Sequence, residues 1–202
     1  MSCGLYKKRK LTRHQTTTFT IFSAPMIMII LFPSVDNPVS QSFYDRAVSS
    51  VDFSSISCDC CLHDHCFEKY GFYFRSFISS TSIRLRIQRI RCRHCGRTHA
   101  ILLSSMVPYS AHSIEIHIAV ASMPVRDVLE RFQELYSDTA HSIRRRFRKY
   151  WKDLIHICDA AADHIASSCL LRFGRQFMQC RGSSLYLRTN IDESPVCCTF
   201  PS

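Results

Sequence analysis

Cys58-Asp59-Cys60-Cys61 and Cys92-Arg93-His94-Cys95-Gly96 each contain a C-x-x-C pair, and these pairs determine which fold we expect. Two such pairs present four thiolates to one tetrahedral ion, and the two-residue spacer lets both sulfurs of a pair reach it at about 2.3 Å. Gly96 suits a tight turn with positive φ. The alternative is a pair of disulfides or four unrelated buried thiols. The predicted ligands of one structural Zn²⁺ are Cys58, Cys61, Cys92 and Cys95.

The composition is that of a basic globular protein. The chain has 202 residues with 46% hydrophobic content, enough for one domain or two small ones. Its 26 Lys and Arg against 16 Asp and Glu give a net charge of +10, which favours a polyanionic partner. Twelve cysteines in so long and basic a chain indicate cytoplasmic metal ligands rather than a secreted disulfide scaffold. Six other cysteines have no ligand spacing: Cys3, Cys158, Cys169, Cys180, Cys197 and Cys198.

The N-terminal region combines a basic stretch with a short apolar run. The run over 21–33 is interrupted by Ser and Pro, and it is too short to span a bilayer, which needs about 20 residues. We therefore expect no membrane association and a buried strand that ends at Pro33. Met26 or Met28 could be the natural start instead of Met1, which would make residues 1–25 an extension without a role in the fold.

The segment between and after the cysteine pairs has the pattern of a β-hairpin. Residues 71–77 are aromatic, and residues 83–87 alternate apolar side chains with arginine, as a strand with one buried face does. The alternation breaks between Ile87 and Ile90, which predicts a bulge or bend. Residues 98–103 are a third candidate strand. This order of knuckle, hairpin, knuckle and strand is that of a zinc ribbon.

Arginines are concentrated around the second predicted strand and the second knuckle. Some could only balance the negative charge of four thiolates around Zn²⁺, and others could form a solvated face. The remaining arginines would contact the phosphate groups of a nucleic acid. The predicted nucleic-acid-binding residues of the ribbon are Arg84, Arg86, Arg91, Arg93 and Arg97.

After Pro108 the pattern becomes helical. We expect a short helix over 113–122 and an amphipathic helix over 125–136 with a polar face of mixed charge. A further helix has a buried stripe over 143–155 and a strongly basic opposite face. Such a pair is typical of a helix-turn-helix, although an ordinary helical hairpin remains the alternative. The predicted DNA contacts on this face are Arg144, Arg145, Arg148, Lys149 and Lys152.

The region from Cys58 through Tyr70-Gly71-Phe72-Tyr73 to Thr98 resembles the N-terminal zinc ribbon of bacterial insertion-sequence transposases. The continuation over 102–110 is similar to an uncharacterised bacterial family, a domain of unknown function related to those transposases, and the resemblance covers roughly residues 26–200. It implies a protein with a zinc ribbon and a helix-turn-helix that binds DNA. Asp59 departs from the family pattern, where Pro is usual, but the ligand spacing is intact.

A catalytic role is not expected. Only about 45 residues follow the basic helix, too few for a nuclease domain of ordinary size. The acids there are Asp159, Asp163, Asp192 and Glu193. His63, His65 and Cys66 could replace a ligand or bind a second ion, but a Zn²⁺ closed by four thiolates has no open position for water.

The sequence therefore predicts an α+β fold, a small β zinc ribbon followed by a helical, helix-turn-helix-like region. The expected partner is double-stranded DNA, with no small-molecule substrate; a zinc-stabilised protein-interaction module is the alternative, and a metal-dependent nuclease is a third hypothesis. The predicted segments are an extension (1–25), an N-terminal strand and loop (26–57), the zinc ribbon (58–110), the helical region (111–157) and a C-terminal tail (158–202).

Overall fold

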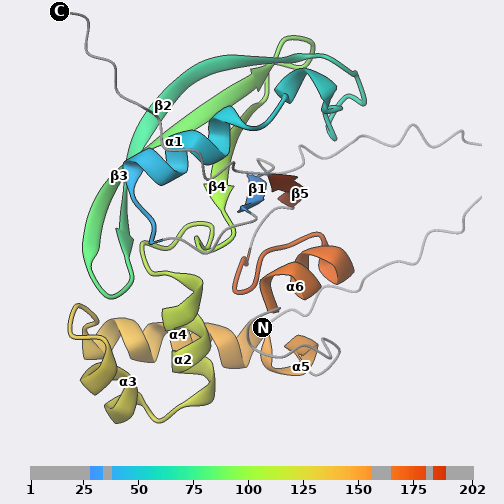
Figure 1. Ribbon diagram of the computed structural model, residues 1–202. Coiled ribbons are helices and arrows are strands. Elements are labelled where there is room, and N and C mark those ends of the chain that lie inside the picture. Colours follow the sequence, from blue (N-terminus) through green and yellow to red (C-terminus); the bar gives the residue numbers. More distant parts are fainter. Residues whose placement is uncertain (1–27, 34–37, 156–164, 181–183, 190–202) are drawn as a thin grey trace, which may run out of the picture.

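The structure, a computed structural model, describes residues 28–33, 38–155, 165–180 and 184–189. Its fold is mixed α+β, with a β-sheet in one half and a group of helices in the other (Figure 1). The predicted extension over 1–25 lies outside the described residues, as does Met26. The strands are β1 (Met28–Pro33), β2 (Phe67–Ile78), β3 (Ser82–Cys92), β4 (Thr98–Leu103) and β5 (Ser184–Thr189). The helices are α1 (Gln41–Ser49), the 3₁₀ turn η1 (Phe53–Ser55), α2 (Ile114–Ser122), α3 (Val125–Arg131), α4 (Ser137–Tyr150), α5 (Lys152–Ile155) and α6 (Ile165–Phe173).

Among the described residues the sheet has five strands in the order β2-β3-β4-β1-β5. The β2–β3 and β3–β4 pairs are antiparallel, whereas β1 pairs in parallel with both β4 and β5. Ile30 lies between Leu102 of β4 and Tyr186 of β5. This central position explains the apolar sequence of β1, because a strand with neighbours on both edges and cover on both faces has no polar side. The strands of this sheet therefore come from segments spread between residues 28 and 189 of the chain.

The β2–β3 hairpin carries the predicted irregularity, but on the partner strand. The β2–β3 register shifts between Lys69 and Gly71, so that Tyr70 is the extra residue of a β-bulge on β2. Gly71 has a φ of 143°, which few other residues adopt. The bulge lies opposite Arg89 and Ile90, where the alternation of β3 breaks. The sequence located the irregularity correctly, and the structure assigns it to β2.

Helix α1 packs where β3 and β4 separate. Its Ser40 N-cap hydroxyl accepts a hydrogen bond from the Phe43 N–H, and the buried side chains of α1 form one stripe. The Tyr44 hydroxyl donates to the Ile101 carbonyl of β4 (2.9 Å) and accepts from the Gln88 N–H of β3 (2.8 Å). Burial raises the pKa of Tyr44 well above its usual value. Tyr44 therefore bridges two strands that do not pair with each other at this point.

A second hydrophobic core lies among the helices. Helices α2, α3 and α4 bury Ile116, Val128 and Ile143 against Trp151 and Phe177. The helix predicted over 125–136 ends at Arg131, five residues early, and the following residues turn toward α4. Phe132 lies in the turn after α3 and is still buried in this core. The helical spacing of apolar residues therefore extends beyond the end of the helix.

Hydrogen bonds join the two halves of the molecule. The partly buried Arg75 guanidinium of β2 donates to the carbonyl oxygens of Val107 and Ser110, and this burial lowers the pKa of Arg75. The Gln176 amide donates to the Ser104 carbonyl (2.6 Å) from the far end of the chain. The helical half is thereby attached to the end of the sheet at which β2 and β4 terminate.

Candidate metal centre and basic surfaces

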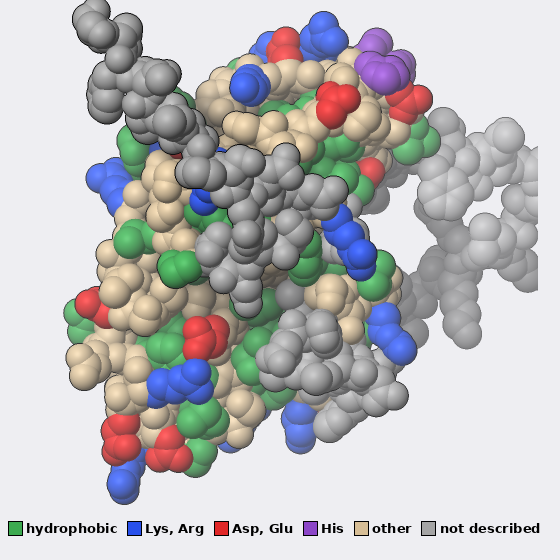
Figure 2. Space-filling view, viewed as in Figure 1, with side chains coloured by type: hydrophobic (Ala, Val, Ile, Leu, Met, Phe, Trp, Pro, Cys, Tyr) green, Lys and Arg blue, Asp and Glu red, His purple; other side chains and the backbone are tan. Residues whose placement is uncertain are grey.

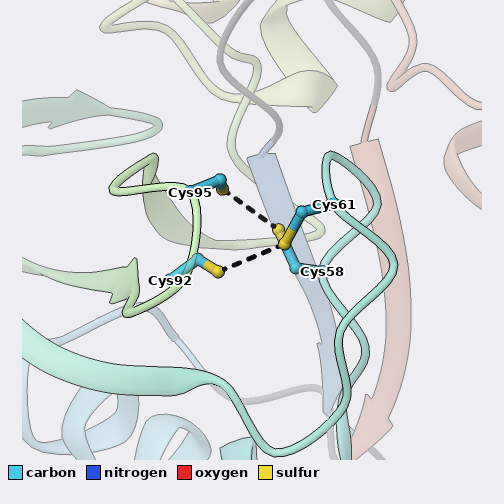
Figure 3. Close-up of side chains that lie close together, drawn as sticks. All are labelled: Cys58, Cys61, Cys92 and Cys95. Atoms are coloured by element: carbon cyan, nitrogen blue, oxygen red, sulfur yellow. Dashed lines mark hydrogen bonds between the residues drawn. The ribbon is translucent and has the colours of Figure 1, made fainter.

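The four predicted cysteines converge on one point. Their sulfur atoms all lie within 4.8 Å of one another. The Cys58 and Cys95 sulfurs are 3.7 Å apart and the Cys61 and Cys92 sulfurs 3.5 Å apart, so each close contact joins one knuckle to the other (Figure 3). Cys58 and Cys92 are buried, and the other two are partly buried. The four thiols can hold a metal ion, and no disulfide joins them.

The two knuckles have the same backbone geometry. In the first, the Leu62 N–H donates to the Cys58 carbonyl (2.7 Å) and the Cys58 N–H to the His63 carbonyl (2.9 Å). In the second, the Gly96 N–H donates to the Cys92 carbonyl (2.9 Å), while the Cys92 N–H donates to the carbonyl five residues on (2.8 Å). Leu62 and Gly96 occupy equivalent positions, both with positive φ (58° and 71°). The turn predicted at Gly96 is confirmed, and Leu62 adopts it without being glycine.

The thiols differ in how readily they lose a proton. Burial raises the pKa of Cys95 to about 11. Burial also opposes ionisation of Cys92, but the N–H groups of Cys95 and His94 and the Cys66 thiol stabilise its thiolate and lower its pKa to about 6. A metal ion needs thiolates as ligands. Cys92 is therefore the cysteine of the cluster whose thiolate the surrounding groups favour most.

The histidines and the extra cysteine beside the cluster do not form a second site among the described residues. The buried Cys66 thiol donates to the His63 carbonyl (3.1 Å), and burial raises its pKa to about 12. The rings of His63 and His94 stack with their centroids 3.8 Å apart. Histidine side chains (purple) gather at this end of the molecule in Figure 2. Elsewhere Cys169 is buried and Cys180 exposed, whereas Cys3, Cys158, Cys197 and Cys198 lie outside the described residues.

The predicted arginines of the sheet have different surroundings. Arg91 donates twice to the Glu68 carboxylate (2.7 and 3.0 Å), and Arg86 lies 3.9 Å from Asp45. Arg93 is exposed and donates to the His65 carbonyl (3.1 Å), and Arg97 is partly buried. Arg84 is exposed and forms no ion pair within the described part of the chain.

Aromatic side chains share this face, and they are not among the predicted nucleic-acid-binding residues. Phe72 and Phe74 are each 55% exposed, and their rings meet edge to face at 5.7 Å. The guanidinium of Arg84 lies 4.7 Å from the centre of the Phe74 ring, and that of Arg86 lies 5.4 Å from the centre of the Phe72 ring. The alternation of apolar residues and arginine in β3 could have revealed them, because its exposed face must be continued by every second residue of β2.

Helix α4 presents a basic exposed face. Arg145, Arg148 and Lys149 are exposed, as is Lys152 at the start of α5, and in the described residues none of the four pairs with a carboxylate. Helix α3 differs: Arg126 pairs with Glu130, and Arg131 pairs with Glu115 of α2. Acidic (red) and basic (blue) side chains lie beside one another over this region in Figure 2. The predicted contrast in charge between the two helices is present.

Arg144 has a different environment from the other basic residues of α4. Its guanidinium donates to the Val120 carbonyl (2.7 and 3.0 Å) and to the Met123 carbonyl, at the C-terminal end of α2. Carbonyl groups at the end of a helix have no partner within that helix. A cation there is also stabilised by the negative C-terminal end of the helix dipole. Arg144 therefore positions α4 against α2.

The remaining predictions concern catalysis and membranes. Asp159, Asp163, Asp192 and Glu193 lie outside the described residues. None of the described helices has the length and the apolar character that crossing a membrane requires.

Comparison with known proteins identifies one region of the chain. Neither the curated proteins nor the solved structures contain a match. Residues 58–146, which begin at the first cysteine of the cluster and end within α4, match the model of an uncharacterised family described as a domain of unknown function (DUF6431).

Proposed function

We propose that this protein binds double-stranded DNA, as a transposase-related zinc-ribbon protein. In this proposal one Zn²⁺ stabilises the knuckle end of the sheet, and α3 and α4 act as a helix-turn-helix-like pair in which α4 contacts DNA. The protein is then a binding protein and not an enzyme. The exposed basic face of α4 is the observation that carries the proposal.

Zinc is the metal that the cluster fits best. Tetrahedral coordination with Zn–S bonds of about 2.3 Å places neighbouring sulfurs about 3.8 Å apart. The close contacts between the knuckles are 3.7 and 3.5 Å, and all four donors are thiols. With four protein ligands the ion has no open position, so its role is structural. Cys58 and Cys61 would hold it from the loop before β2, Cys92 from the end of β3 and Cys95 from the turn between β3 and β4.

The charge of α4 suits a phosphate backbone. Its apolar side is fixed in the helical core by Ile143, so the opposite side must face outward. Arg145, Arg148 and Lys149 lie on that side without carboxylate partners in the described chain. Unpaired basic groups on a helix attract DNA through counterion release, and a helix of this size fits the major groove. Lys152 extends the basic face, and Arg144 holds it in place.

The sheet would supply further backbone contacts. Arg84 and Arg93 are the exposed candidates, and Arg97 is a partly buried one. Arg86 and Arg91 already pair with carboxylates and should contribute less. The zinc–thiolate centre itself carries negative charge, so some of this arginine charge serves the metal site.

The test is duplex binding by a charge-reversal variant. We expect Arg145→Glu/Arg148→Glu/Lys149→Glu to weaken binding of the full chain to a labelled duplex at least 100-fold at moderate salt. The slope of log affinity against log salt should also fall by about three, because about 0.9 counterion is released per phosphate contact. Fluorescence anisotropy at several salt concentrations measures both quantities.

A matched control separates a defined surface from net charge. Arg126→Glu/Arg172→Glu/Arg175→Glu reverses three exposed basic residues outside α4, so it changes the net charge equally. It should retain most of the affinity and the salt slope. If both variants bind alike, the α4 surface does not contact DNA. Full duplex binding by the α4 variant would instead favour a zinc-stabilised protein-interaction module.

A further inference from the structure

The exposed face of the β2–β3 hairpin has a composition that neither the core nor a duplex-binding surface requires. Phe72 and Phe74 of β2 lie on one face with Arg84 and Arg86 of β3, because Phe74 is the cross-strand partner of Arg86. Each guanidinium lies over the ring diagonal to it, at 4.7 and 5.4 Å. We call Phe72, Phe74, Arg84 and Arg86 the hairpin face.

The aromatic rings of the hairpin face are not part of either hydrophobic core. Tyr73, Leu85 and Ile87 on the opposite side of the same strands provide the packing of the hairpin. Phe72 and Phe74 each leave 55% of their surface exposed, and the bulged Tyr70 leaves 49%. Grouped exposed aromatic side chains mark an interaction site rather than ordinary surface.

The charge on this face selects the kind of partner. An apolar protein surface would bury both guanidinium groups, and burying a charge without a carboxylate is strongly unfavourable. Arg86 has only Asp45 nearby, at 3.9 Å, and Arg84 has no carboxylate partner among the described residues. A partner with both flat π-surfaces and negative charge would match the rings and the arginines together. Nucleotides have this combination.

The rings favour unpaired nucleotides over a duplex. A base can stack on a protein ring only when its own face is free, which is the case in single strands. Alternate residues of a strand are about 6.7 Å apart, and here the two ring centroids are 5.7 Å apart. The rings meet edge to face at 79°, so they offer two stacking positions of different orientation, which a flexible single strand can follow and a duplex cannot. The guanidinium groups over the rings offer phosphate contact.

We infer that the hairpin face binds single-stranded nucleic acid, with bases stacked on Phe72 and Phe74 and the backbone held by Arg84 and Arg86. This goes beyond the duplex binding proposed for α4, because it concerns another form of nucleic acid and a surface separate from that helix, although the arginines of this surface are also candidate duplex contacts. Tyr70 lies beside Arg91, whose guanidinium is 4.8 Å from the ring centre, and can extend the site by one base.

The test compares single strands with a duplex. Full-length protein is titrated with labelled oligo(dT), oligo(U) and a mixed-sequence duplex of equal length. Phe72→Leu/Phe74→Leu keeps apolar side chains but removes the rings, and it should weaken single-strand binding at least tenfold. Duplex affinity should stay within twofold. The α4 charge-reversal variant should show the reverse preference, so failure of either proposal is seen separately.

A second measurement does not depend on affinity. In Phe74→Trp the new indole should be quenched when oligo(dT) or oligo(U) stacks on it, and single-strand affinity should be retained. The native Trp151 is buried and serves as the background signal of the unsubstituted protein. Unchanged single-strand affinity of the Leu variant with normal circular dichroism would overturn the inference, as would an equal loss of single-strand and duplex binding. A preference between oligo(dT) and oligo(U) would identify DNA or RNA as the natural ligand.

Discussion

Leu62 and Gly96 occupy the same position in the two knuckles, and only glycine adopts this conformation freely. A Cβ at Gly96 would meet no atom within 4 Å, so Gly96→Ala introduces backbone strain alone. We expect it to lower the free energy of unfolding by about 1 kcal/mol. Leu62→Gly relieves the same strain and should change stability by less than about 0.5 kcal/mol, because greater freedom of the unfolded chain offsets the gain. Urea unfolding of the zinc-loaded proteins measures both free energies. An equal loss of stability in Leu62→Gly and Gly96→Ala would contradict the backbone strain assigned to Leu62.

His117 makes stability depend on pH. It is buried in α2 with its Nδ1 hydrogen-bonded to the Ser113 carbonyl (2.9 Å), and burial lowers its pKa from 6.5 to about 4. As the pH falls below 6.5 the unfolded chain takes up the proton first, so stability is lost between about pH 6.5 and 4, by up to about 3 kcal/mol.

We expect His117→Leu to flatten the pH dependence of the unfolding free energy in this range. Denaturant titrations at pH 7, 6 and 5 measure it. The exposed His141 of α4 provides the control His141→Leu, and the metal site affects all three proteins alike. An unchanged pH slope in His117→Leu would contradict the assignment.

For single residues, the sequence predicts the roles that depend on local spacing along the chain. The four cysteines were identified because a two-residue spacer limits where their sulfurs can lie, and the structure brings all four together. Arg144 could not be distinguished from Arg145 in this way. Both lie on the polar side of a predicted helix, and only tertiary packing places the α2 carbonyls within reach of Arg144.

At the scale of the elements, Tyr44 joins α1 to two strands with one hydroxyl group. Tyr44→Phe leaves the buried Ile101 carbonyl and the Gln88 N–H without this partner. We expect a loss of about 1–3 kcal/mol in the free energy of unfolding, because buried polar groups without hydrogen bonds are unfavourable. Tyr150→Phe removes a hydroxyl from a half-exposed ring and should have little effect. Thermal unfolding compares them, and equal stability of the two variants would show that the bridge does not matter.

The periodicity of the sequence predicted individual helices and strands better than it predicted which of them lie side by side. The alternation in β3 and the stripe in α4 report which side of each element is buried, and both are present. The apolar run of β1 predicted a buried strand but could not name β4 and β5 as its partners, because pairing in a parallel sheet leaves no local pattern. The end of α3 was missed because the same apolar spacing serves a helix and the buried turn after it.

At the scale of the whole molecule, two separate cores predict an uneven response to metal removal. The cysteine cluster adjoins the sheet core, whereas α2, α3 and α4 pack around Val128 and Ile116. We expect a strong chelator, or Cys92→Ser, to lower the melting temperature. Amide hydrogen exchange should accelerate first in the knuckles and the adjoining ends of β2 and β3, while the centre of α4 stays protected. Equal acceleration in both halves would show that they unfold as one unit.

The central position of β1 also has a consequence for folding during synthesis. Met28–Pro33 is made early, yet one of its two neighbours, Ser184–Thr189, emerges about 150 residues later. At about 5–20 residues per second, β1 waits roughly 10–30 s for that neighbour. During this interval one edge of an entirely apolar strand remains open to other chains. Slow elongation or truncation before residue 184 should therefore promote aggregation of the nascent protein, and shielding of this strand by a chaperone should suppress it.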